Sequence, residues 1–224
     1  MRPSPPANPR KSRSSMHRIA VFASGRGSNF TALLEARKAG VFPGEIVLLL
    51  SDKKDAGALE TARQQGVETF VLDSPRAKGR LSLEEERAFA EACREAHADW
   101  VCLAGFMRIL RGPLLEAFEG RILNIHPALL PAFPGLEGPK QAFDYGARVA
   151  GCTVHFVDAG VDTGPIVLQR AVPVLDGDDA AELAARILVE EHRIYAEALR
   201  RLLTERWERR GRRVVFIPSE EKPS

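Results

Sequence analysis

The sequence predicts an α/β fold, a doubly wound and mostly parallel sheet with helices on both faces. Strand-like and helix-like segments alternate through the first half of the chain, an order typical of parallel strands joined by helices. The predicted strands are almost continuously apolar, which is typical of strands buried on both faces. After residue 126 the rhythm changes to a Pro- and Gly-rich loop, 127–138, followed by β-rich segments.

The individual elements follow from the spacing of apolar residues and from turn-forming residues. In the first half, strands are expected at 18–24, 46–51, 69–72 and 100–104, and helices at 28–38, 56–65 and 83–96. In the second half, strands are expected at 121–125, 149–157 and 165–174, a short helix at 140–145, and a long helix at 178–203. The long helix begins with acidic residues and ends with basic ones, as the helix dipole favours.

A single domain is expected over residues 17–204, because the predicted elements run through them without a break. Residues 1–16 are rich in Pro and Ser and are expected to be a disordered basic extension. Met16 directly precedes the first predicted strand and is a candidate start of the protein. Residues 205–224, which include a charge cluster at 209–213, are expected to be a solvated C-terminal tail.

Charge and hydropathy exclude two kinds of partner. The net charge is +2, but residues 1–16 contain four basic residues and no acid, so they carry +4 and the rest carries −2. The body of the chain shows no basic face and only 7% aromatic residues, so no nucleic acid is expected as a partner. Apolar runs such as 46–50 are far shorter than the roughly 20 residues that span a bilayer, so no membrane is expected either.

The cysteines indicate a reducing compartment. Cys93, Cys102 and Cys152 are odd in number, widely spaced and without a CxxC pair. This pattern favours neither a disulfide framework nor a zinc site. A cytoplasmic protein without a metal is therefore expected, with Cys102 filling the core inside the apolar run 100–104.

A glycine loop, 24–29, stands between the first predicted strand and the first predicted helix. Glycines let the backbone approach a ligand closely, and the free N–H groups of a helix start attract an anion such as phosphate. The loop also resembles the start of a dinucleotide fingerprint, with Asp52 as the ribose-binding acid, but Phe30 holds the third glycine position. A phosphate or sugar phosphate is therefore favoured over NAD. The structural alternative is a tight turn capped by Ser28 or Asn29.

Three polar residues are the candidate catalytic groups: Asn124, His126 and Asp162. Asn124 and His126 are two apart on a predicted strand and therefore point to the same side. Such a trio suits acyl transfer, in which an amide donates to the developing oxyanion, a histidine moves the proton, and a carboxylate raises the pKa of the histidine. No Ser or Cys nucleophile is evident nearby, which favours direct transfer. His155 is either a supporting residue or a core histidine.

Four stretches carry a resemblance to a known family: 24–29, 103–110, 123–131, and 154–157 with 162–165. Through them the chain, over about residues 17–203, resembles the phosphoribosylglycinamide formyltransferases, the folate-dependent enzymes of purine synthesis. The Asn-Ile-His-Pro stretch with a downstream Asp is typical of formyl-folate hydrolases and transferases. The glycine loop and Ala-Gly-Phe-Met-Arg-Ile-Leu, in this order, favour the glycinamide enzyme.

The resemblance implies a Rossmann-like formyltransferase fold for residues 17–204, and transfer of the formyl group of 10-formyltetrahydrofolate to the amine of 5'-phosphoribosylglycinamide. His126 would be the proton donor, Asn124 the oxyanion partner and Asp162 the group that raises the pKa of His126. The residues implied for the phosphorylated substrate are Gly27, Ser28, Asn29, Leu188, Val189, Glu190 and Glu191, with Glu191 on the ribose hydroxyls. Those implied for formyl-folate are Met107, Arg108, Ile109, Leu110, Asn124, Asp158, Ala159, Gly160, Val161 and Asp162.

Several alternatives stay open. The family's folate-contacting arginine matches either Arg80 or Arg87, and the segment 136–140 departs from the family, whose members often carry His or another polar residue near Glu137. A formyltetrahydrofolate deformylase and a methionyl-tRNA formyltransferase share the catalytic trio, but each carries an additional domain that this length disfavours. A non-catalytic nucleotide-binding module would leave the trio without a purpose. Only small-molecule partners are expected, and a homodimer is compatible with the sequence.

Overall fold

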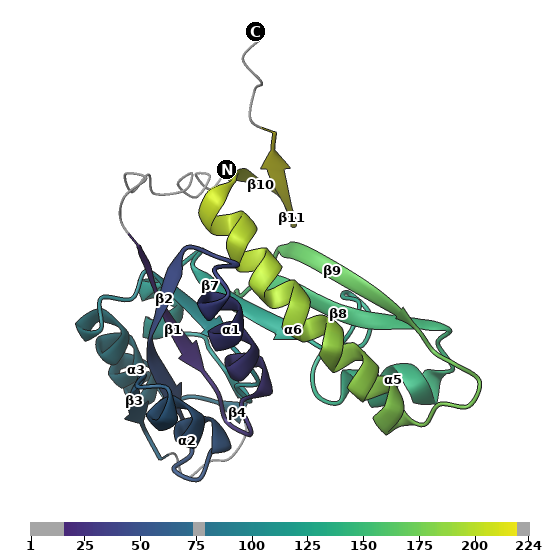
Figure 1. The fold of residues 1–224 in the computed structure, drawn as a ribbon, viewed down its shortest axis with the longest axis horizontal. Coiled ribbons are helices and arrows are strands. Elements are labelled where there is room, and N and C mark those ends of the chain that lie inside the picture. The colour runs from purple at the N-terminus through teal and green to yellow at the C-terminus, as the bar shows by residue number, and fades with distance from the viewer. Residues whose placement is uncertain (1–15, 74–78, 219–224) are drawn as a thin grey trace, which may run out of the picture.

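The structure is a computed structural model that describes residues 16–73 and 79–218. Within these residues, nine strands form one sheet in the order β10-β11-β9-β8-β7-β5-β1-β2-β3 (Figure 1). The strands of this sheet are β1 (His17–Phe22), β2 (Gly44–Ser51), β3 (Glu68–Val71), β5 (Trp100–Leu103), β7 (Ile122–His126), β8 (Val149–Phe156), β9 (Ile166–Pro173), β10 (Arg206–Arg210) and β11 (Arg213–Ile217). A second, two-stranded sheet pairs β4 (Gly79–Arg80) with β6 (Arg108–Ile109). The helices are α1 (Ser28–Lys38), α2 (Gly57–Gln64), α3 (Leu83–Glu95), α4 (Pro113–Ala117), α5 (Gly138–Tyr145) and α6 (Ala180–Thr204).

The direction of the strands divides the large sheet. Strands β3, β2, β1, β5 and β7 run parallel, whereas β8 lies antiparallel between β7 and β9. The predicted α/β fold with a mostly parallel sheet is confirmed for the part of the sheet that the alternating pattern covers. The antiparallel strands replace the crossover helices after β7, where the sequence pattern changes.

The two faces of the sheet are both buried, which explains the continuously apolar strands. In β1, Ile19 and Val21 belong to the core cluster that contains α1 and α6 side chains. The alternate residues Ala20 and Phe22 belong to the opposite cluster, in which Phe22 packs edge-on against Phe89 of α3 with ring centroids 5.2 Å apart. Because successive side chains point to opposite faces, a strand covered on both sides has no polar position.

The long helix α6 fixes the strand ends that carry the site. Its start is a capping box in which the Asp179 side chain accepts from the N–H groups of Ala181 and Glu182. In its middle, the buried Tyr195 hydroxyl lies 3.0 Å from the carbonyl oxygen of Leu103 and 3.2 Å from that of Leu123. Burial raises the pKa of Tyr195 well above its usual value, so the hydroxyl stays a donor that ties α6 to β5 and β7.

The predicted C-terminal tail is wrong for residues 206–217, which form the hairpin β10–β11, although the charge cluster at 209–213 is exposed to solvent as predicted. The hairpin adds to the sheet where Arg213 of β11 pairs with Ile166 of β9. The Trp207 ring packs against Phe156, with centroids 5.5 Å apart. The charged residues of the hairpin lie mostly near its turn. The prediction rested on these charges and overlooked the apolar side chains, such as Trp207 and Phe216, that pack both strands against the core. The predicted extension at 1–16 lies outside the described residues except for Met16, which is exposed.

The three cysteines are free thiols buried in the core, and burial raises the pKa of Cys102 to about 12. The predicted role of Cys102 as a core residue is confirmed by its complete burial. Across residues 16–73 and 79–218, no helix combines the length and apolar character needed to cross a membrane.

Candidate active site

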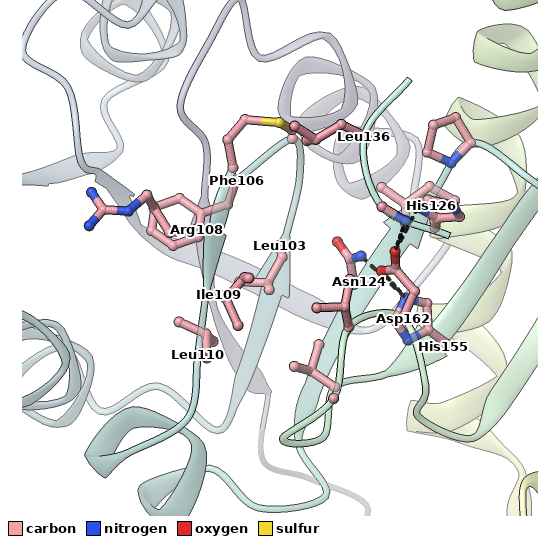
Figure 2. Close-up of a pocket in the computed structure, with 18 of the residues that line it drawn as sticks. Leu103, Phe106, Arg108, Ile109, Leu110, Asn124, His126, Leu136, His155 and Asp162 are labelled. Carbon is pink, nitrogen blue, oxygen red and sulfur yellow. Dashed lines mark hydrogen bonds and ion pairs between the residues drawn. The ribbon is translucent and has the colours of Figure 1, made fainter. Parts of the chain in front are cut away.

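A cavity of about 390 Å³ opens at the carboxyl ends of β5 and β7 (Figure 2). One wall is the segment 106–110, which includes β6, and the opposite wall is the loop that follows β8 and carries Asp162. Asn124 and His126 project into the cavity from β7, so both side chains lie on the same side of the strand as the spacing predicts. Strand ends that diverge in this way form the ligand sites of many α/β folds.

His126 is buried and is held through both of its ring nitrogens. Nδ1 lies 3.4 Å from Oδ2 of Asp162, and Nε2 lies 2.9 Å from the carbonyl oxygen of Phe133. The structure thus places Asp162 beside His126, a proximity that the sequence does not show. Both neighbours are hydrogen-bond acceptors, so an imidazolium with two N–H donors satisfies the site completely. This arrangement suits a residue that donates a proton.

Asp162 is held in an ionised state by three groups. Burial opposes its ionisation, but hydrogen bonding from His155, the nearby His126 ring and the backbone N–H of Gly135 outweigh this effect and lower the pKa of Asp162. The Gly135 N–H donates to Oδ2 over 2.8 Å. The residue adopts a left-handed backbone (φ 53°), which Asp tolerates better than most side chains. The carboxylate is therefore negative at neutral pH and lies beside the His126 ring.

His155 is a polar partner of the site and not a passive core histidine. It pairs with Asn124 across the β7–β8 ladder, and its Nδ1 donates to the carbonyl oxygen of Phe156 over 2.9 Å. Nε2 lies 3.2 Å from Nδ2 of Asn124 and 3.6 Å from Oδ1 of Asp162. Nε2 donates to Asp162 when it carries a proton and accepts from Asn124 when it does not, so His155 contacts two of the three candidate catalytic groups.

The glycine loop adopts a conformation that only glycine allows at its centre. Gly27 has a left-handed backbone (φ 78°), and a Cβ placed on it would lie 2.5 Å from Cβ of Ala58. Helix α1 begins directly after it at Ser28, and no side chain caps its first turn. The N-cap is Gly27, so the alternative of a turn capped by Ser28 or Asn29 is wrong. N–H groups at a helix start that lack a side-chain cap can bind an anion.

Asn29 and Glu191 join the glycine loop to α6. Nδ2 of Asn29 donates to Oε2 of Glu191 over 2.7 Å, and both residues are buried. Burial raises the pKa of Glu191, although the hydrogen bond from Asn29 lowers it in part. Glu191 is therefore shielded from solvent although it carries a carboxylate and lies on a surface helix. Among its neighbours, Val189 is exposed and Glu190 pairs at the surface with Arg193.

The wall of the cavity expected to meet the folate contributes backbone and apolar groups. Met107, Ile109 and Leu110 line the cavity, whereas the Arg108 guanidinium points away from it (Figure 2) and lies 3.3 Å from Asp52. The Asp52 carboxylate is completely buried and also accepts from the Ser24 hydroxyl over 2.6 Å. Asp52 is therefore committed within the protein, and the structure does not support its role as a ribose-binding acid.

Of the other residues implied for formyl-folate, some line the cavity and others shape the loop that forms its wall. The loop residues Asp158, Gly160 and Val161 line the cavity; Ala159 is not among the lining residues. The Asp158 carboxylate accepts from the Thr163 hydroxyl over 2.6 Å and so shapes its own loop. Sequence reasoning did not assign the lining residues Phe106, Leu136 and Val157, which carry no polar group that would single them out.

The two candidate arginines lie in different places. Arg80 is on β4, which pairs with β6 of the cavity wall so that Arg80 is opposite Ile109. Arg87 is on α3 and lines a separate surface hollow together with Arg94 and Glu116. Of the two, only Arg80 adjoins the cavity wall. In the described part of the chain, no group of three or more His, Cys, Asp or Glu side chains is placed to hold a metal ion.

The fold is that of a formyl-transferring enzyme, and the formyl transferase family matches residues 17–199. The chain belongs to that family. It is 39% identical over 188 residues to the phosphoribosylglycinamide formyltransferase of Bacillus subtilis, an alignment that covers 84% of this chain and 95% of that protein. The crystal structure of glycinamide ribonucleotide transformylase 1 from Symbiobacterium toebii superposes with a TM-score of 0.85 at 52% identity, covering 91% of this chain and 95% of that one.

More distant and longer relatives also match. A formyltetrahydrofolate deformylase from Pseudomonas syringae superposes with a TM-score of 0.79 at 25% identity, covering 92% of this chain and 67% of that one. Several trifunctional purine biosynthetic proteins match at 42–44% identity, and the chain spans 13–18% of their length. The formyltransferase unit thus occurs both alone and within larger proteins.

Proposed function

We propose that the protein transfers the formyl group of 10-formyltetrahydrofolate to the amine of 5'-phosphoribosylglycinamide. The products are formylglycinamide ribonucleotide and tetrahydrofolate, as in de novo purine biosynthesis. The observation that carries this proposal is the juxtaposition of Asn124, His126 and Asp162 at one cavity. The names of the most similar relatives support the choice of substrates. The reaction uses small molecules only, and we place it in the cytoplasm.

The cavity fits a reduced folate. A pterin is flat, carries donors and acceptors along its edge, and suits a slot with apolar faces and backbone hydrogen-bonding groups. The walls supply Ile109, Leu110 and Val161 as apolar surface and the backbone of 107–110 and 158–162 as polar edge. Folates end in an acidic tail, and Arg80 beside the wall is our candidate for holding it.

Asn124 and His126 divide the chemistry of the transfer. The bond from the amine nitrogen to the formyl carbon forms while the bond from that carbon to the folate nitrogen breaks. Asn124 donates its second amide N–H to the carbonyl oxygen as negative charge develops there. His126 gives a proton to the departing nitrogen, and the proton lost by the amine restores the balance. The Asp162 carboxylate lies 3.4 Å from Nδ1 of His126 and would stabilise positive charge on the ring.

Direct transfer agrees with the groups at the cavity. None of the described residues that line it is a serine, threonine or cysteine, so no hydroxyl or thiol is in place to take the formyl group first. The phosphorylated substrate would bind with its phosphate on the glycine loop at Gly27, Ser28 and Asn29 and its ribose at Glu191. Leu188, Val189 and Glu190 would border the ribose without a central role.

The test is to mix purified protein with 10-formyltetrahydrofolate and follow tetrahydrofolate release with and without phosphoribosylglycinamide. Release that requires the amine supports the transferase. Release at the same rate without the amine would favour the deformylase, to which this fold is also similar. Tight NAD binding without any formyl-folate turnover would instead indicate a nucleotide-binding module. Sedimentation of the same sample would show whether the protein is a homodimer.

A further inference from the structure

A buried ion pair lies behind the folate wall, on the side that faces away from the cavity. The side chains of Arg108 and Asp52 are both completely buried, with Nη1 and Oδ2 3.3 Å apart. Burying two charges is costly unless other hydrogen bonds compensate them, so such a pair requires a structural or functional reason. Neither side chain takes part in the chemistry described above.

Two connections lead from Asp52 to the wall. The first is the ion pair itself, because Arg108 belongs to β6 in the wall. The second passes through Ser24, whose hydroxyl donates to Oδ1 of Asp52 over 2.6 Å and accepts the backbone N–H of Met107 over 3.1 Å. Asp52 thus holds two successive residues of the wall, one through its side chain and one through its backbone.

The guanidinium of Arg108 extends the connection to β4. Its Nε donates to the carbonyl oxygen of Gly79 over 3.3 Å, and Nη2 donates to that of Arg80 over 3.1 Å. Nη2 also lies 3.5 Å from the carboxylate of Glu85 at the start of α3. The Arg108 guanidinium and the Asp52 carboxylate therefore join four segments: the ends of β1 and β2, strand β4 and strand β6.

We propose that Asp52 is a positioning residue for formyl-folate, acting through the Asp52 network (Ser24, Asp52 and Arg108). The inference rests on the proposed function. A wall that binds through its backbone cannot adapt by rotating side chains, so its position must be fixed from behind. The network fixes the wall backbone and the segment that bears Arg80, and it meets the glycine loop only at the first residue of that loop, Ser24.

The test is Asp52→Asn, which keeps the shape and removes the charge. We expect the KM for 10-formyltetrahydrofolate to rise about tenfold, since the wall loses its position, while kcat and the KM for the ribonucleotide change by less than about threefold. The matched control is Asp176→Asn, because Asp176 pairs with Arg148 at the exposed surface. The control should leave all three constants unchanged.

A second, milder variant keeps the test informative if Asp52→Asn does not fold. Ser24→Ala removes one connection and keeps the ion pair, and we expect a rise of about threefold in the same KM. In the double variant the effects should be less than additive, because both act through Asp52. Thermal melting of each variant shows whether it is folded. Equal changes in both KM values and kcat, or an unchanged folate KM in folded variants, would overturn the inference.

Equilibrium binding separates this inference from the proposed function. Calorimetric titration with tetrahydrofolate should give weaker binding to Asp52→Asn than to the wild type. A wild type that does not bind tetrahydrofolate would overturn the proposed function. A wild type that binds it, with equal affinity in the Asp52→Asn variant, would overturn the positioning role alone.

Discussion

The two walls of the cavity present different kinds of group to a ligand. In the wall built from β6, the charged side chain of Arg108 is bound to Asp52, and the lining residues Ile109 and Leu110 are apolar. In the part built from β7 and the loop of Asp162, backbone groups of Phe133, Gly135 and Phe156 hold the side chains, and the side chains face the cavity. The first arrangement suits binding and the second suits chemistry, so the two should be separable by mutation.

The largest expected effect is on the chemical step. His126→Ala should lower kcat by about a thousandfold, because it removes the proton donor, and should leave the KM for the ribonucleotide nearly unchanged. Steady-state kinetics with both substrates checks this, with His97→Ala as the control at an exposed position. Normal turnover in the His126→Ala variant would show that His126 is not the proton donor, and would contradict the assignment of the chemical step to its wall.

A smaller effect is expected at the glycine loop. Asn29→Ala removes the donor that holds Glu191 beside the loop. We expect the KM for the ribonucleotide to rise about tenfold, while the folate KM and kcat stay within about threefold. The control is Gln64→Ala on the exposed part of α2. A normal KM for the ribonucleotide would show that neither Asn29 nor its contact with Glu191 contributes to substrate binding.

The smallest effect concerns stability and pH. The pKa of Asp162 is lowered in the folded protein, so its carboxylate adds stability above the ordinary value of 3.8, and this contribution is lost as the pH falls through the folded pKa. Asp162→Asn should therefore melt below the wild type near neutral pH, with the difference shrinking below about pH 4. Melting curves from pH 3 to 7 check this, with the exposed Asp176→Asn as the control. A difference that does not depend on pH would exclude the ionised carboxylate as its cause.

The sequence predicted well where local pattern decides structure. Strands buried on both faces must be apolar throughout, and the period of two places Asn124 and His126 on one side of β7. The sequence could not place Asp162 beside His126. The two residues meet because β8 runs antiparallel to β7 and because residue 162, in the loop after β8, has a left-handed backbone. The burial of Glu191 and Arg108 was equally hidden, since each is compensated by a partner far away in the sequence. The hairpin at 206–217 was missed because its charges dominate its composition.

The central claim is that the formyl group moves directly from the folate to the substrate amine. The most direct measurement is a single turnover with 10-formyltetrahydrofolate labelled with ¹⁴C in the formyl group, quenched at intervals and separated into protein, ribonucleotide and free formate. We expect the label to pass to the ribonucleotide without appearing on the protein, at a rate that depends on the amine. Label on the protein before it reaches the ribonucleotide, or label released as formate whether or not the amine is present, would contradict direct transfer.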